Sequence, residues 1–566
     1  MSLPALRLRR SDGVLLVLAL LSAALFFSHV SQLWPMIPGN LRHPLGDWQA
    51  QAAGLDELLG TDLTGFSCES RLRVDGPALD CVEHRLGRAR AVALITEGLP
   101  VAWHKATFKQ AGDPDSVTVA FLLDGRLMGW ERSVQEDMAS NDPLVDPERI
   151  AHAAAARLVG SLDGYDEIEH GVHTFPARTD RHWLFERAWP DTGAVPLRER
   201  IEIQLAGKEV VKCWRSLVLP GVAAREERAD AVPRQSLEAV GFSLLAAAGV
   251  SAAAIALRRL ALGQARLGPA ARIAIIVGVL LVLTHALQPA LIFEQWDPLG
   301  PRWLAAGKEL IYDLMDDLSV LIMLFFFMVA GDALDRLPPA SAPGERQLAP
   351  RRAASLWALG SGRLGDWGVI SASLRGFLVG AVCGGVLAGG TLLAVACLHA
   401  RVQLQPRGFF FYPLNAWSPP LITLCFFTQI ALLEELGYRF FAGTWLERLS
   451  GSRYLAVLIP AAVYGLCHTN FEFLPPADPW WFRPLLLACV GSIWGWAFFR
   501  FDALTVVLSH LTCDLFIFNW PLMHLGGWNA VEATLVILVP LVPAGLGLAL
   551  QLRSVGPAGA RSWRPG

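Results

Sequence analysis

Apolar stretches of about 20 residues recur along most of this chain, separated by short polar segments. Hydrophobic residues make up 53% of the 566 residues and charged residues only 17%, whereas soluble domains contain about 25% charged residues. A segment inside a bilayer must satisfy its own backbone hydrogen bonds, and for apolar runs of this length the helix is the solution. The sequence therefore predicts an α-helical polytopic membrane protein.

The predicted membrane spans number about ten. Arginines gather in the segments between alternate spans, and an N-terminus in the cytoplasm places all of these arginine groups on the cytoplasmic side. The same orientation places residues 31–235 outside the cytoplasm. The predicted spans are 13–30, 236–257, 272–293, 310–331, 373–398, 419–441, 454–475, 483–500, 503–520 and 530–552.

Residues 36–235 differ from the rest of the chain because they have the charge density and the strand patterns of a soluble domain. Hairpins are predicted at 116–134 and 197–219, where turn residues separate alternating apolar runs. A helix is predicted at 146–162, with Asp146 as its N-cap. One helix packed on an antiparallel sheet makes this a small extracytoplasmic α+β domain, inserted after the first span.

Changes in composition set the predicted domain boundaries. Proline, alanine and arginine are frequent in 337–368, which we interpret as a cytoplasmic linker between two groups of spans. In the polar domain Cys68 and Cys81 are candidates for a disulfide, which their spacing alone does not decide. The predicted domains are an N-terminal span at 1–35, the α+β domain at 36–235, spans two to four at 236–336, the linker at 337–368, a second membrane domain at 369–552 and a cytoplasmic tail at 553–566.

Ionisable residues interrupt the apolar pattern on three of the later spans. Such residues are costly in lipid, so they face one another, water or a functional site. Glu435 and Arg439 are four residues apart and are expected to pair along their helix. Glu434 lies about 100° around the same helix and needs another partner. The other two spans supply the candidates, which are His468 on one and His510 with Asp514 on the other.

These residue types suit hydrolysis. A carboxylate beside an imidazole can hold and deprotonate a water molecule for attack on an amide carbonyl, and His468 and His510 are the imidazoles available to Glu434. The other of the two histidines could stabilise the oxyanion that forms. Cys467 and Cys513 lie near the two histidines in the sequence, so a cysteine nucleophile is an alternative.

The three motifs in order resemble those of the CPBP family, which includes the type II CAAX prenyl endopeptidases and bacterial relatives linked to bacteriocin processing and self-immunity. The motifs read Glu434-Glu435-x-x-x-Arg439, Tyr464-x-x-x-His468 and His510-x-x-x-Asp514, and the similar region spans about 370–550.

The resemblance implies that 369–552 is an intramembrane protease domain and that the protein is a peptidase. It implies that Glu434 and His468 activate water, and that His510 and Asp514 support the oxyanion. Glu435, Arg439 and Tyr464 would support the motif helices. The third motif departs from the prenyl endopeptidases, which have asparagine where this chain has Asp514. An ionised aspartate cannot donate a hydrogen bond, so Asp514 would be protonated, orient His510 or bind a cation.

Other functions fit part of the pattern. Zinc could be held by Glu434, His468, His510 and Asp514, although the sequence contains no HExxH helix. A non-catalytic immunity or scaffold protein, a proton-relaying transporter and a polar network that only fixes packing are further alternatives. We expect no cofactor and no nucleic-acid partner. The predicted partners are the lipid bilayer and a membrane-associated protein or peptide substrate.

The frequent alanine, arginine, leucine and glycine suggest a bacterium with GC-rich coding. The predicted location is therefore the bacterial inner membrane, where prenylated CaaX substrates are not expected.

Overall fold

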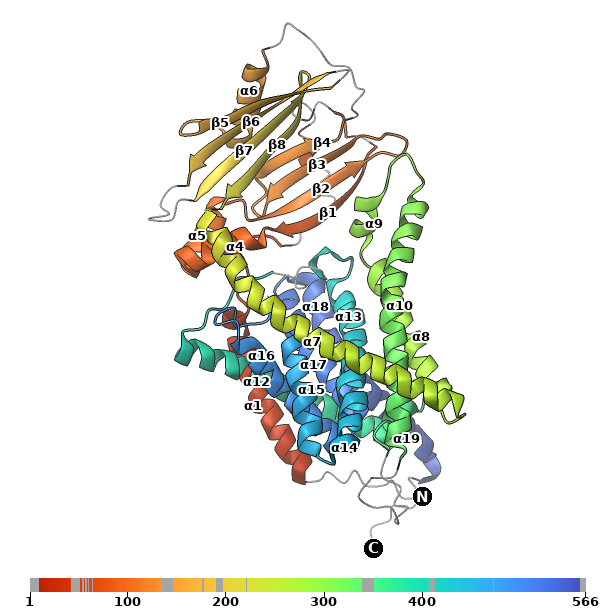
Figure 1. The fold of residues 1–566 in the computed structure, drawn as a ribbon. Helices are drawn as coiled ribbons and strands as arrows, with labels where there is room; N and C mark the ends of the chain where they lie inside the picture. The colour runs from red at the N-terminus through yellow and green to blue at the C-terminus, as the bar shows by residue number, and fades with distance from the viewer. Residues whose placement is uncertain are drawn as a thin grey trace.

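A computed structural model places a β-sheet domain at one end of a bundle of long helices (Figure 1). We call the end of the bundle next to the sheet its sheet side. The structure describes residues 10–41, 51–52, 55, 59, 61–63, 65–134, 146–175, 178–189, 197–219, 221–337, 351–406, 413–471 and 473–559.

The sheet contains eight antiparallel strands in the order β1-β2-β3-β4-β8-β7-β6-β5, so β1 and β5 form its edges. The predicted hairpins are β3–β4 and β7–β8. Strands that pair in the sheet are consecutive in the sequence, with the exception of β4 and β8. The strands are β1 (Ser67–Val74), β2 (Ala102–Lys109), β3 (Ser116–Leu122), β4 (Leu127–Arg132), β5 (Asp166–Thr174), β6 (Thr179–Ala188), β7 (Arg198–Ala206) and β8 (Glu209–Val218).

Three helices of the described part of the chain accompany the sheet. The predicted helix is α6 (Pro147–Val159), and the side chain of Asp146 caps it by accepting hydrogen bonds from two backbone N–H groups. Two helices that the sequence analysis did not predict, α4 (Gly76–Leu86) and α5 (Arg88–Glu97), lie between the sheet and the bundle (Figure 1). The disulfide considered for Cys68 and Cys81 is absent, because both are buried free thiols.

Within the described residues, nine helices are long and apolar enough to cross a membrane, and Arg453–Cys467 is a shorter apolar helix. These ten helices correspond to the ten predicted spans, and the protein is a multi-pass membrane protein. The bundle contains α1 (Arg10–Leu33), α7 (Gly221–Ala261), α8 (Leu267–Ala286), α10 (Arg302–Asp335), α12 (Trp367–Leu398), α13 (Pro419–Glu434), α14 (Thr444–Ser450), α15 (Arg453–Cys467), α16 (Phe482–Arg500), α17 (Ala503–Met523), α18 (Gly527–Ile537) and α19 (Val542–Gly559), with the short helices α9 (Pro289–Gln295) and α11 (Ala354–Gly360).

Several boundaries differ from the prediction: α15 ends at Cys467 rather than at 475, and the predicted span 530–552 is divided into α18 and α19. Helix α7 begins at Gly221 rather than at 236, because alanine, glutamate and arginine in the preceding segment favour helix and carry it out of the membrane toward the sheet. The predicted linker 337–368 contains α11, whose Leu356 and Ala358 are buried. An apolar run that can be covered by neighbouring helices folds onto them even inside a polar segment.

Helices α12 and α17 cross at small residues, which positions the third motif. A Cβ atom added at Gly380 would lie 2.5 Å from the carbonyl oxygen of Ser509 and 2.5 Å from Cβ of Thr512. Glycine at such a crossing lets two membrane helices approach closely. Because His510 follows Ser509 on α17, the close approach at Gly380 holds this part of α17 in place.

We therefore expect Gly380→Ala to destabilise the bundle. Relieving the overlap requires the helices to separate, and overpacking of this kind costs about 1–3 kcal/mol. Tryptophan fluorescence during thermal unfolding in detergent would measure the loss as a lower Tm. Gly545→Ala on α19 is the matched control, since a Cβ atom there meets nothing within 4 Å. Equal Tm values for the two variants would contradict the close crossing.

Candidate active site

The first motif lies where α13 changes into a π-helix, Glu435–Gly443. Single π-helical turns are rare and recur at functional sites. Within this turn Nη1 of Arg439 donates to Oε1 of Glu435 at 2.8 Å. The two side chains are 2% and 1% exposed, so each charge depends on the other for compensation. This is the pairing expected from their spacing.

Glu435 has a second contact that the sequence did not indicate. Nδ1 of His510 lies 2.7 Å from the same Oε1 atom of Glu435. Because a carboxylate only accepts hydrogen bonds, Nδ1 of His510 carries the proton. Glu435 therefore orients the histidine of the third motif as well as pairing with Arg439.

Glu434 lies between the two motif histidines. Its Oε1 is 3.7 Å from Nε2 of His468, and its Oε2 is 3.7 Å from Nε2 of His510. Both separations are too long for direct hydrogen bonds, but each can be bridged by a water molecule. Among the described residues, Oε2 of Glu434 is buried without a hydrogen-bond partner, which is the situation that an internal water relieves.

The other ring nitrogen of His468, Nδ1, also has a hydrogen-bond partner. Nδ1 of His468 lies 2.8 Å from the backbone carbonyl of Tyr464, one helical turn earlier. A carbonyl can only accept, so Nδ1 carries a proton and Nε2 of the neutral ring presents its lone pair toward Glu434. A water between Glu434 and His468 would thus find two acceptors for its hydrogens.

Asp514 joins the same group from α17. Its Oδ2 lies 3.4 Å from Nε2 of His510, the nitrogen that also faces Glu434. Glu434, Tyr464, His468, His510 and Asp514 together line one cavity of about 100 Å³. This volume accommodates water molecules, for which about 10–15 Å³ is the minimum. The structure therefore brings at least one polar residue of each motif to one cavity, whereas Glu435 and Arg439 do not line it.

Aromatic side chains make up much of the remaining wall, and one of them has a specific role. Trp494 stacks on His510 with ring centroids 4.1 Å apart and an interplanar angle of 20°. Its Nε1 donates to Oγ of Ser509 at 2.9 Å. Sequence reasoning missed Trp494 because a tryptophan in an apolar span has no signal that separates it from lipid-facing residues.

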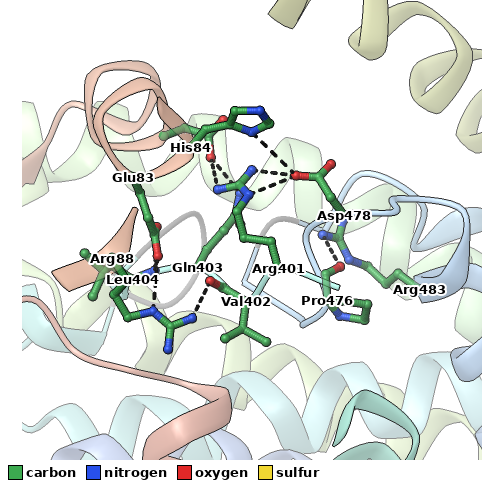
Figure 2. Close-up of polar contacts among 11 residues, drawn as sticks. Glu83, His84, Arg88, Arg401, Val402, Gln403, Leu404, Pro476, Asp478 and Arg483 are labelled. Atoms are coloured by element: carbon green, nitrogen blue, oxygen red, sulfur yellow. Dashed lines mark hydrogen bonds and ion pairs between the residues drawn. The ribbon is translucent and has the colours of Figure 1, made fainter. Parts of the chain in front are cut away.

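The loop that follows His468 is held by a buried arginine at the start of α16. Arg483 is 2% exposed. Its three guanidinium nitrogens donate to the backbone carbonyls of Thr469, Leu474 and Pro476, at 3.1, 2.7 and 3.1 Å. Figure 2 shows the contact with Pro476. Because Thr469 is adjacent to His468, Arg483 fixes the chain on one side of the second motif.

The same loop contacts the sheet domain through Arg401 (Figure 2). Arg401 donates to Oδ2 of Asp478 at 2.7 Å and to Oδ1 of Asp80, on α4, at 2.9 Å. Its backbone N–H also donates to the carbonyl of Asp478. Nearby, both carboxylate oxygens of Glu83 accept from the backbone N–H of Leu404. Helix α4 is thereby joined to two loops of the bundle, one of which continues from His468.

The candidate zinc ligands do not close around one position. A metal ion requires its ligand atoms to lie near one another, at metal–ligand distances of about 2.0–2.2 Å for zinc. Within the described part of the chain, the one set of three such atoms within 4.8 Å is Glu148, His152 and Glu167, at the surface of the sheet domain.

Comparison with known protein families matches the region of the three motifs to one family of membrane proteases. Residues 416–516 match the family described as type II CAAX prenyl endopeptidase Rce1-like. The resemblance stated from the sequence is confirmed for this segment, which contains all three motifs. No curated protein and no solved structure matches the chain.

Removing one partner of the buried Glu435–Arg439 pair is expected to destabilise the protein far more than removing one partner of an exposed pair. Glu435→Ala leaves Arg439 without its compensating charge, so we expect about 3–5 kcal/mol of destabilisation, measured by thermal unfolding in detergent. Glu97→Ala is the control. Its pair with Arg90, at 3.1 Å, is partly exposed, and such pairs contribute about 0–1 kcal/mol. A similar small loss in both variants would contradict the structural role of Glu435.

Proposed function

We propose that this protein is an intramembrane endopeptidase that hydrolyses a peptide bond of a membrane-associated protein or peptide with a water molecule activated by Glu434 and His468. The observation that carries the proposal is the position of Glu434, whose two oxygens lie 3.7 Å from Nε2 of His468 and 3.7 Å from Nε2 of His510. The match of residues 416–516 to a protease family supports the same class of reaction.

In the proposed reaction the water donates its hydrogens to Glu434 and His468, which leaves an oxygen lone pair free to attack the carbonyl carbon. Glu434 takes one proton as the new C–O bond forms. The same proton passes to the leaving nitrogen as the C–N bond breaks. This sequence requires one carboxylate that can accept and return a proton, and the buried Oε2 of Glu434 has no hydrogen-bond partner among the described residues.

His510 is proposed to stabilise the oxyanion. With Nδ1–H held by Glu435, a proton on Nε2 would make His510 cationic and let it donate to the oxyanion. Asp514, 3.4 Å from Nε2, would share and orient that proton. Trp494 keeps the ring plane fixed by stacking on it. Of the three roles that the sequence left open for Asp514, we therefore assign it that of orienting His510.

The proposed location is the bacterial inner membrane with residues 31–235 outside the cytoplasm. The helix ends that carry Arg258, Arg259, Arg336, Arg453 and Arg500 all lie at the end of the bundle away from the sheet, which supports a cytoplasmic position for that end.

The principal test measures cleavage of a labelled peptide library by purified protein. We expect Glu434→Ala and His468→Ala each to lower the cleavage rate at least about 100-fold, the lower end of what a general base contributes. Gly545→Ala serves as a control for handling in detergent, since it changes no contact. Cleavage by both variants at the wild-type rate, with unchanged Tm, would refute the proposed mechanism, whereas absence of cleavage by the wild-type protein would favour a non-catalytic immunity or scaffold role.

The alternative of a zinc-dependent protease makes a different prediction for the same assay. Chelator treatment followed by zinc addition would abolish and then restore its cleavage, whereas the proposed reaction uses no metal.

Asp514 is tested by two substitutions of similar size. Asp514→Asn keeps a polar group that can accept from or donate to its neighbours, so we expect it to retain cleavage within about tenfold of wild type. Asp514→Leu leaves Nε2 of His510 without that partner, and we expect a loss of about 100-fold in kcat. Equal activity of the two variants would show that Asp514 does not act on His510.

A further inference from the structure

Strand β1 is an edge of the sheet, and it is the strand nearest the bundle (Figure 1). An edge strand presents backbone N–H and C=O groups that can pair with another extended chain. At Leu72 of β1 a side chain already makes the backbone hydrogen bonds that a neighbouring strand would make. The side-chain amide of Asn415 accepts from the N–H of Leu72 at 2.7 Å and donates to its carbonyl at 3.5 Å. The amide of Asn415 therefore occupies the place that a neighbouring strand would take at Leu72.

The register of β1 shows which other groups face the same way. Leu72 is paired with His104 of β2, and Ser70 is paired with Ala106 without an intervening bulge. In an antiparallel ladder residues two apart direct their backbone groups to the same side. The N–H and C=O of Ser70 therefore point away from β2, as those of Leu72 do. Among the described residues neither group of Ser70 has a hydrogen-bond partner.

A cavity of about 650 Å³ lies against this edge and is lined by Ser70 and Leu72 of β1 and by the segment that follows α1, including Met36 and Asn40. Asn415, Trp417, His524 and Asn529, from the sheet side of the bundle, also line it. Its volume is in the range of about 300–1,000 Å³ typical of binding pockets. Polar and apolar side chains are mixed along it, which suits a polypeptide of varied sequence.

The large cavity and the active-site cavity follow one another along α17. Pro521 lines the first, and Ile517, Asp514 and His510 line the second. Phe518 also lines the second cavity and packs on Phe427 with ring centroids 4.1 Å apart. From Pro419 to Glu434, the two ends of α13, the helix rises about 23 Å, a distance that about seven residues of extended chain would span.

We propose that the edge of β1 binds an extended segment of the substrate by strand addition and holds it above the active-site cavity. The substrate class is then a membrane polypeptide with an unfolded segment of at least about seven residues on the sheet side of the cleaved bond. The sheet domain is thus a receptor for substrate backbone rather than for a particular side chain. The link to cleavage depends on the proposed function, but the binding itself does not.

Binding is tested separately from hydrolysis in the full-length Glu434→Ala protein. The probe is a fluorescein-labelled, unstructured peptide of about 12 residues, long enough to fill the cavity edge, and fluorescence anisotropy measures its Kd. Ser70→Pro removes the outward N–H, and proline is tolerated at such positions of an edge strand. Ser70→Ala is the matched control because it keeps the backbone N–H.

We expect Ser70→Pro to raise the Kd about tenfold or more relative to Ser70→Ala, with unchanged Tm. The same peptide N-methylated at alternate residues should bind the Ser70→Ala protein about tenfold more weakly, which requires no change in the protein. Equal affinities in both comparisons, absence of peptide binding, or dimerisation through β1 in place of peptide binding would overturn the proposal. If Ser70→Pro weakens binding while wild-type protein cleaves no peptide, strand addition stands and the proposed hydrolysis fails.

Discussion

The carboxylate of Glu435 is the interaction on which the candidate active site depends. One of its oxygens accepts from Arg439 at 2.8 Å and from His510 at 2.7 Å, within an almost fully buried environment. A lone charge there would be strongly unfavourable, and the arginine makes it tolerable. Because the arginine and the carboxylate share one helix and the histidine belongs to α17, this contact also sets how the two helices meet. Glu434 can face the cavity only because its neighbour already satisfies these two groups.

The active site is also tied to the sheet domain. Arg483 holds three carbonyls of the loop after His468, and Arg401 connects Asp478 at the end of that loop to Asp80 on α4. Hydrogen bonds from guanidinium groups are directional and cannot be shifted without losing partners. Hydrogen bonds therefore join the domain that contains β1 to the loop that follows His468, the histidine proposed to activate water. The proposed binding site on the sheet and the candidate active site in the membrane therefore belong to one connected structure.

Much of the fold was predictable because membrane helices and hairpins have strong local signals. Ten apolar runs correspond to ten helices, and the hairpins predicted at 116–134 and 197–219 form as β3–β4 and β7–β8. Helices α4 and α5 and the extension of α7 were not predicted, since short amphipathic helices resemble surface loops in composition. For the site, the spacing of the motifs indicated which polar residues needed partners. It did not reveal that His510 binds Glu435 or that Trp494 stacks on it.

By itself, the sequence determined that this chain spans the membrane many times and that a small set of charged side chains must find one another there. It determined this because apolar length and the cost of buried charge are properties of individual segments. Only the tertiary structure decided which carboxylate pairs with arginine and which one remains available for water. It also decided that an edge strand lies beside a cavity in line with the site. Both depend on contacts between segments far apart in the chain, which no local pattern encodes.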